Sequence, residues 1–154
     1  DEIVSENIEF IRRTFNPEQH ALIGAHVTLC REDELEPLEK VMANLEALEF
    51  APITIHFGKP VRFSDEKGVL LPAIGNNTPF FILRELVLNS VVETPRKHEP
   101  HLTLIHPRNA TCTDAIFEKI QKIDLPESLT FTKISLIEQE MGEKWQVLKE
   151  FYCL

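Results

Sequence analysis

The feature that most constrains the fold of this chain is a tetrapeptide pattern that occurs twice, as His26-Val27-Thr28-Leu29 and as His101-Leu102-Thr103-Leu104. The copies begin at residues 26 and 101, an offset of 75 residues in a chain of 154. A resemblance at a fixed offset indicates a fold built from equivalent units, each with the same order of elements. The segments that follow the two copies test this interpretation.

The same order of elements is predicted after each copy of the motif. Apolar residues spaced three and four apart predict a helix from Leu35 to Leu48 and another from Ile116 to Ile123, where Thr113 is suited to the N-cap. Each helix is followed by an alternating segment, a polar turn that contains glycine, and a returning strand. In the first unit these lie at 53–57, 65–68 and 69–74, and in the second at 129–134, 140–143 and 145–148, with an extension towards residue 151.

The repeat also bears on the first residues of the sequence. A helix predicted over 78–91, with Thr78 as cap and Pro79 as its first residue, maps onto residues 3–16, where Ile3, Val4, Ile8 and Ile11 form an apolar stripe. The strand predicted at 69–74 maps onto positions before Asp1. We therefore expect a single domain over residues 1–154, with interleaved lobes and with its first strand upstream of residue 1.

Each motif predicts a strand with a polar face and an apolar face. Residues i and i+2 of a strand point to the same side, so His26 shares a face with Thr28, and His101 shares a face with Thr103. The valine and leucines between them face a core. If the two lobes are related by an approximate two-fold axis, the polar faces converge across a cleft.

Two imidazoles and two hydroxyls in one cleft suit phosphoryl transfer. A histidine has an ordinary pKa near 6.5, so at neutral pH one imidazole can accept a proton while the other donates one. Threonine hydroxyls can donate hydrogen bonds to the non-bridging phosphate oxygens. None of these steps requires a metal ion or a cofactor. A single His-x-Thr strand is a weak signal, because a lone histidine is often structural, but two copies at matching positions favour a functional pair.

With both motifs established, the chain resembles the 2H phosphoesterase superfamily, and within it the bacterial 2′-5′ RNA ligase-like proteins and cyclic phosphodiesterases. The resemblance covers essentially the whole chain, including a closing strand from Trp145 to Leu154. It implies an α+β, bilobal, duplicated fold, with two antiparallel sheets each backed by helices and a pseudo-two-fold axis through a central cleft. It also implies that His26, Thr28, His101 and Thr103 are catalytic. The implied substrates are 2′,3′-cyclic phosphates, 2′-5′ linkages or related cyclic nucleotides.

Charge and composition limit the substrates and cellular surroundings that we expect for this protein. There are 16 basic and 25 acidic residues, a net charge of −9, and such a surface repels long nucleic acids. We therefore expect short RNA ends or nucleotides as substrates, and no long duplex. No apolar run approaches the length of about 18 residues that indicates a membrane span. Three scattered cysteines indicate a reducing compartment, so we expect a cytoplasmic protein. The sequence does not define an oligomeric state and is compatible with a monomer.

Other polar residues near the motifs have two interpretations each. Arg31 and Arg108 could steer a phosphate group or could be solvated surface cations. Trp145 could stack on a base or pack in the core. His56, on a predicted strand, could be a core residue or could line the cleft.

A metal site at the second motif is not indicated. His98, His101 and His106 do not have the spacing of a metal-ligand set, so we expect loop or surface roles for His98 and His106. Cys30, Cys112 and Cys153 are interpreted as small core residues, because Cys30 and Cys112 have no nearby histidine or aspartate that would activate them.

Two alternatives to an enzyme remain at this point. A binding module could hold a phosphorylated RNA end or a nucleotide without turnover, although it could lose one histidine without penalty. A purely structural two-lobed domain would instead bury both histidines away from any cleft, with a hydrogen-bond partner for each.

Overall fold

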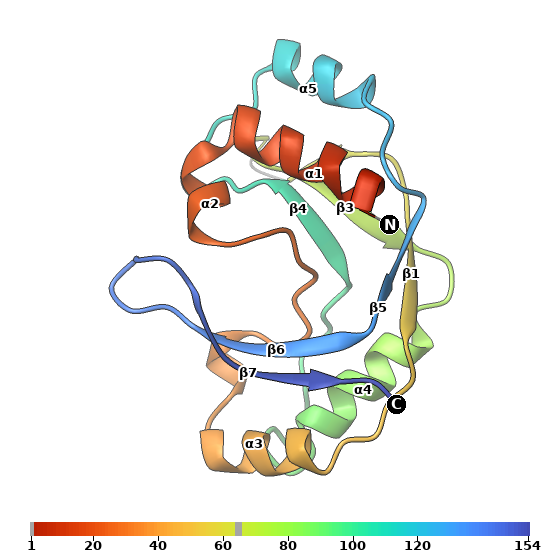
Figure 1. The fold of residues 1–154 in the computed structure, drawn as a ribbon, viewed down its shortest axis with the longest axis vertical. Coiled ribbons are helices and arrows are strands. Elements are labelled where there is room, and N and C mark those ends of the chain that lie inside the picture. The colour runs from red at the N-terminus through yellow and green to blue at the C-terminus, as the bar shows by residue number, and fades with distance from the viewer. Residues whose placement is uncertain (1, 64–65) are drawn as a thin grey trace.

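The structure is a computed structural model that describes residues 2–63 and 66–154, and it has a mixed α+β architecture (Figure 1). The helices are α1 (Glu2–Phe15), α2 (Pro17–Leu22), the 3-10 helix η1 (Glu32–Glu34), α3 (Leu38–Glu46), α4 (Thr78–Val87) and α5 (Asp114–Gln121). The strands are β1 (Ile53–Phe57), β2 (Val61–Arg62), β3 (Val69–Ile74), β4 (His101–Ile105), β5 (Ser128–Phe131), β6 (Lys133–Glu138) and β7 (Gln146–Tyr152). None of the helices in the described ranges has both the length and the apolar character needed to cross a bilayer.

The strands form two antiparallel sheets. In the larger sheet β3 pairs with β4 along one edge and with β1 and β2 along the other, and β1 continues to β5. The smaller sheet is the hairpin of β6 and β7. In Figure 1, α3 and α4 lie towards one end of the molecule, and α1, α2 and α5 lie towards the other.

Each sheet has its own hydrophobic core. The larger core joins Ile8 and Ile11 of α1 to Leu71 of β3 and to Leu102 and Leu104 of β4, all of them at most 2% exposed. This packing explains why α1 has an apolar stripe and why β4 alternates between buried and half-buried residues. The smaller core has buried Val41 and Leu45 of α3 and Val87 of α4, with Ile134 and Phe151 of the hairpin packed against them.

Most predicted elements are present close to their predicted bounds. β1 covers 53–57 and β3 covers 69–74, as predicted. The α5 helix follows Thr113, whose hydroxyl accepts a hydrogen bond from the backbone N–H of Ile116, as an N-cap does. The predicted helix over 78–91 ends at Val87 instead. The side chains of Ile3 and Val4, and Asp65 of a predicted turn, lie outside the described part of the structure.

Two strand predictions are wrong in part. The single strand predicted over 129–134 is divided at Thr132, with β5 in the larger sheet and β6 in the hairpin. The first motif, predicted as a strand, makes only one bridge, from Val27 to Leu102 of β4. The physical reason is that the carbonyl oxygens of Thr28 and Leu29 accept hydrogen bonds from side chains, which takes these acceptors out of a backbone ladder.

Candidate active site

The two motifs lie side by side in the structure. The bridge between Val27 and Leu102 is antiparallel, so His26 is opposite Thr103, and Thr28 is opposite His101. Leu102 is 2% exposed and belongs to the core, and Val27 packs against the same core. The four polar residues therefore share the other face. The structure brings together the residues that the sequence singled out, as neighbours on adjacent segments.

Both histidines are held in the same way by their own backbone. His26 Nδ1 lies 2.8 Å from the carbonyl oxygen of Gly24, and His101 Nδ1 lies 3.0 Å from that of Glu99. A carbonyl oxygen can only accept, so Nδ1 carries the hydrogen in each ring. Each imidazole therefore has Nε2 as the nitrogen that can take up or release a proton.

The surroundings of His26 favour its neutral form. Burial among protein atoms lowers the pKa of His26 below 6.5, and the positive charges of Arg12 and His101 act in the same direction. The hydrogen bond to Gly24 and the charge of Glu9 oppose the shift without reversing it. His26 is nevertheless one of the exposed residues, so neighbouring protein atoms desolvate the ring only in part and a ligand can reach it.

Helix α1 holds the segment that leads into His26. Arg12, 3% exposed, donates to the carbonyl oxygen of Ile23 at 2.6 Å and to Glu9 at 2.9 Å. Glu9 in turn accepts the backbone N–H of Ala25 at 2.6 Å. This partly buried ion pair therefore fixes the backbone on both sides of Gly24, whose carbonyl orients the His26 ring.

His101 lies among rings. Phe63 meets it edge to face at 6.4 Å between ring centroids, and the ring of His98 lies 5.9 Å away. His98 stacks on Phe80 and donates Nε2–H to the carbonyl oxygen of Thr28 at 2.9 Å. Its predicted loop position is confirmed, but the sequence did not show that this loop contacts the first motif.

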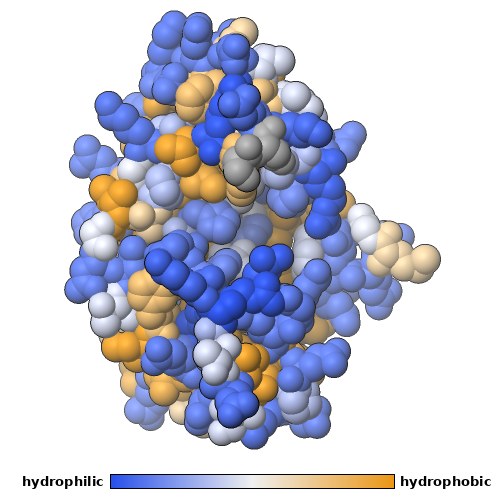
Figure 2. Space-filling view, turned by 180° about the vertical axis from the view of Figure 1, so that it is seen from behind, coloured by the Kyte–Doolittle hydropathy of each residue, from blue (hydrophilic) through white to orange (hydrophobic). Residues whose placement is uncertain are grey.

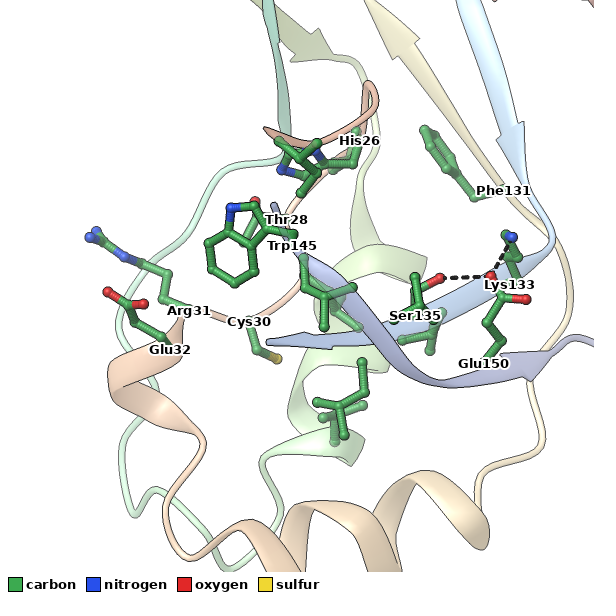
Figure 3. Close-up of a pocket in the computed structure, with 18 of the residues that line it drawn as sticks. His26, Thr28, Cys30, Arg31, Glu32, Phe131, Lys133, Ser135, Trp145 and Glu150 are labelled. Carbon is green, nitrogen blue, oxygen red and sulfur yellow. Dashed lines mark hydrogen bonds and ion pairs between the residues drawn. The ribbon is translucent and has the colours of Figure 1, made fainter. Parts of the chain in front are cut away.

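A pocket of about 690 Å³ opens beside the first motif and includes His26 and Thr28 in its lining (Figure 3). His101 and Thr103 lie alongside on β4 and are not among the described residues that line it. The other charged, polar or aromatic lining residues include Arg31, Glu32, Phe80, His106, Arg108, Phe131, Lys133, Ser135, Gln139, Trp145 and Glu150. In the view of Figure 3, Trp145 is drawn in front of Thr28, and Lys133, Ser135 and Glu150 are grouped on the hairpin.

The structure shows where the residues lie whose roles the sequence left open. Arg31 and Arg108 are exposed and line the pocket. Trp145 is half-buried at the pocket wall, and its backbone N–H bonds to Leu22. His106 lies in the loop after β4, as predicted, and also lines the pocket. His56 is exposed on β1, which excludes a core position, and it does not line the pocket.

The hairpin contributes a polar cluster that the sequence did not reveal. Glu150 accepts hydrogen bonds from Lys133 at 2.5 Å, from Tyr152 at 2.6 Å and from Ser135 at 3.3 Å. The register of β6 against β7, which pairs Ser135 with Glu150 and Lys133 with Tyr152, assembles this cluster. Local periodicity predicts the strands but not their register, so only the structure shows these side chains together.

No group of three or more His, Cys, Asp or Glu side chains within the described ranges is arranged to hold a metal ion. The three cysteines are free thiols; Cys112 is buried and Cys30 is half-buried, as expected for small core residues. Burial raises the pKa of Cys30 to about 11, which makes its thiol unreactive at neutral pH.

The hydrophilic character expected from the charge balance is visible on the molecular surface. Most of the face shown in Figure 2 is hydrophilic, and the hydrophobic side chains there form scattered patches. This agrees with a sequence in which 27% of the residues are charged.

Comparison with known proteins gives the class of this fold and site. Residues 1–143 match the family model described as the 2′-5′ RNA ligase superfamily, and the chain belongs to that family of 2H phosphoesterases. No curated protein matches the sequence.

Several solved structures have a similar fold. The structure of E. coli LigT complexed with NADP+ has a TM-score of 0.64 at 15% identity, and the match covers 99% of this chain and 92% of that one. The structure of E. coli LigT in apo form has a TM-score of 0.65 at 16% identity, with the same coverage. A structure described as a phosphoesterase has a TM-score of 0.66 at 15% identity, with 99% and 93% covered. At these identities the similarity establishes the fold.

Proposed function

We propose that this protein is a metal-independent phosphodiesterase that acts on a 2′,3′-cyclic phosphate or a 2′-5′ phosphodiester of RNA ends or nucleotides. The observation that carries the proposal is that His26 and His101 have the same tautomer and the same kind of hydrogen-bond partner. Each ring donates Nδ1–H to a carbonyl two residues earlier, which leaves Nε2 for proton transfer. Membership of the 2H phosphoesterases supports the same class of reaction.

In the proposed reaction His26 is the general base and His101 is the general acid. The lowered pKa of His26 favours a neutral ring, whose Nε2 takes a proton from the attacking water. The water oxygen forms a bond to phosphorus, and the bond from phosphorus to the leaving ribose oxygen breaks. Nε2 of a protonated His101 gives its proton to that oxygen. The charges are then exchanged between the rings, and proton transfer through solvent restores the starting state.

Thr28 and Thr103 are assigned to the phosphate group. Each lies opposite a histidine of the other motif, so their hydroxyls can donate to the non-bridging oxygens while the histidines act on the bridging ones. These oxygens gain negative charge as the bond to water forms. The threonines are therefore catalytic residues in this proposal.

The architecture is proposed to be one bilobal domain with an approximate two-fold axis between the motifs. The order of elements supports this: α3 and then β1 to β3 follow the first motif, whereas α5 and then β5 to β7 follow the second. In this view the cleft lies between the lobes, and each lobe supplies one histidine and one threonine.

The proposed substrates are short. A pocket of about 690 Å³ is within the range of roughly 300–1,000 Å³ for small-ligand sites, and the net charge of −9 disfavours long nucleic acids. Arg31 and Arg108, exposed in the pocket lining, are suited to steer an anionic substrate towards His26. The structure of E. coli LigT has been solved with ATP and with 3′-AMP, which supports nucleotides as a ligand class.

The experiment that tests this function is hydrolysis of nucleoside 2′,3′-cyclic monophosphates and a 2′-5′ dinucleotide in the presence of EDTA. We expect turnover that survives chelation and that falls by about 10²-fold to 10⁴-fold in His26→Ala and in His101→Ala. His56→Ala, an exposed histidine outside the pocket lining, is the matched control and should retain full activity. Binding of these ligands without turnover would contradict the enzyme and favour a binding module.

A further inference from the structure

The first motif is held against the second by unusually few backbone hydrogen bonds. β3 and β4 are paired at four positions, from Val69 with Ile105 to Pro72 with His101. Across the other edge of β4, the first motif makes the single bridge from Val27 to Leu102. The position of Thr28 relative to His101 must therefore depend on other contacts.

Two side chains donate hydrogen bonds to the backbone of the first motif where a regular strand would make backbone ladder bonds. The carbonyl oxygen of Thr28 accepts Nε2–H of His98 at 2.9 Å, and that of Leu29 accepts Nη1–H of Arg84 at 2.9 Å. Arg84 also donates to the carbonyl oxygen of Arg96 at 3.2 Å. Both donors thus connect the end of the first motif to the segment that enters β4.

His98 is the more direct of the two connections. It precedes His101 by three residues, and its ring lies 5.9 Å from the ring of His101. Stacking on Phe80, with 6.4 Å between centroids and 28° between planes, fixes the ring plane. A displacement of this half-buried ring would therefore change the position of Thr28 relative to His101.

We propose that His98 is a positioning residue, whose hydrogen bond to the Thr28 carbonyl sets the first motif in register with the second for phosphoryl transfer. This inference rests on the proposed function, since register matters here through its effect on the reaction. His98 acts through Thr28 and His101, and it takes no proton from the substrate. Misplacement of reacting groups by about 1 Å can cost on the order of 100-fold in rate, so one such contact can have a large effect.

Two variants separate the hydrogen bond from the packing of the ring. His98→Phe keeps an aromatic ring against Phe80 and removes the donor, whereas His98→Gln keeps an N–H donor at the end of a similar reach and removes the ring. We expect kcat to fall by about tenfold or more in His98→Phe with little change in KM, and to recover largely in His98→Gln. His56→Phe and His56→Gln are the matched controls on β1 and should leave kcat unchanged.

The relative kcat values of His98→Phe and His98→Gln test whether the hydrogen bond or the ring packing matters. If His98 only packs, His98→Phe will be the more active of the two, and the inference is overturned. Unchanged kcat in His98→Phe, with the protein folded by circular dichroism, overturns it as well.

A measurement without substrate separates this inference from the proposed function. The backbone carbonyl resonance of Thr28 and the amide resonance of Leu29, at the peptide group that accepts the hydrogen bond, should shift in His98→Phe and return towards wild-type positions in His98→Gln. If wild type turns over none of the tested phosphodiesters but these shifts occur, the proposed reaction fails and the positioning contact stands. If the resonances do not move in His98→Phe, the positioning role itself is wrong.

Discussion

Glu34 of η1 and Arg84 of α4 form an ion pair in which both side chains are only 4% exposed. Arg84 Nη1 lies 3.0 Å from Glu34, and Arg96 approaches the same carboxylate with Nε at 3.5 Å. The Glu34 carboxylate also accepts the backbone N–H of Arg31 at 2.9 Å. The pair therefore ties the turn after the first motif to the helix and loop that precede the second motif.

Loss of one partner of this pair should be costly. Glu34→Gln leaves the guanidinium of Arg84 buried without its counter-charge, and we expect the free energy of unfolding to fall by about 3–5 kcal/mol. Equilibrium unfolding in urea measures it. Glu46→Gln is the matched control, because its pair with Lys149 is about half exposed and should contribute less than about 1 kcal/mol. Equal losses in the two variants would contradict the importance of burial.

The threonine hydroxyls should affect the rate more than the stability. Thr28→Val and Thr103→Val keep the shape and the β-branch of the side chain, and each is expected to lower kcat by about 10-fold to 100-fold through loss of a donor to phosphate. Steady-state kinetics on a 2′,3′-cyclic nucleotide would show it. Thr54→Val removes a hydroxyl bonded to Thr130 at 2.8 Å on the exposed side of β1 and should leave kcat unchanged. Full activity in both motif variants would remove the threonines from the mechanism.

The pH dependence of kcat/KM should report the shifted pKa of His26. A general base is active when deprotonated, so activity rises with pH through the pKa of His26 in the free enzyme. Because burial lowers this pKa, the midpoint of the acidic limb should lie below 6.5, the ordinary value. A limb centred at or above 6.5 would show that His26 is not the base in this reaction direction.

The free energy of unfolding should also depend on pH because the pKa values of His26 and His98 are lowered in the folded protein. The folded-state pKa values of His26 and His98 both lie below 6.5, so the unfolded chain binds protons more readily. The free energy of unfolding should therefore decrease as pH falls from 6.5 through these lowered pKa values. Urea unfolding across that window should give a shallower dependence for His98→Gln, which removes one of the two groups. An unchanged slope would contradict the linkage.

Gly68 should not tolerate a side chain. A Cβ there would lie 2.8 Å from the backbone oxygen of Ile105 and 2.8 Å from Pro107 Cδ, at the end of β4. Gly68→Ala is expected to destabilise the protein by about 1–3 kcal/mol, measured by thermal or urea unfolding. Gly24→Ala is the control, since the nearest atom to its Cβ is 3.9 Å away. Similar effects of the two substitutions would show that the close approach at Gly68 relaxes easily.

Much of the fold follows from local patterns in the sequence. β4 could be predicted because His101 and Thr103 alternate with buried leucines, and α5 because Thr113 caps an apolar stripe. The division of the 128–138 region at Thr132 could not, because β5 and β6 read as one alternating run and separate only when they join different sheets. The 3-10 turn at Glu32–Glu34 also depends on a distant residue, Arg84, that no local pattern identifies.

The candidate site could likewise be predicted from the sequence only in part. The pairing of His26 with Thr28 and of His101 with Thr103 follows from strand periodicity, and the structure brings the two pairs together. The contact of His98 with Thr28 joins residues 70 apart in sequence, and the hairpin residues in the pocket depend on the register of β6 and β7. Both are tertiary relationships, so periodicity alone does not show them.

The hydrogen bond from each motif imidazole to the carbonyl two residues earlier makes the tautomer a property of a three-residue segment. Gly24 to His26 and Glu99 to His101 each contain both the donor and the acceptor. The surrounding protein therefore need not supply a carboxylate partner to orient the ring, as the aspartate does in a serine-protease triad. An extended segment transplanted together with its two preceding residues would therefore bring the Nδ1–H tautomer with it, whereas the position of its ring relative to the second histidine would still depend on contacts such as those of Arg12 and His98.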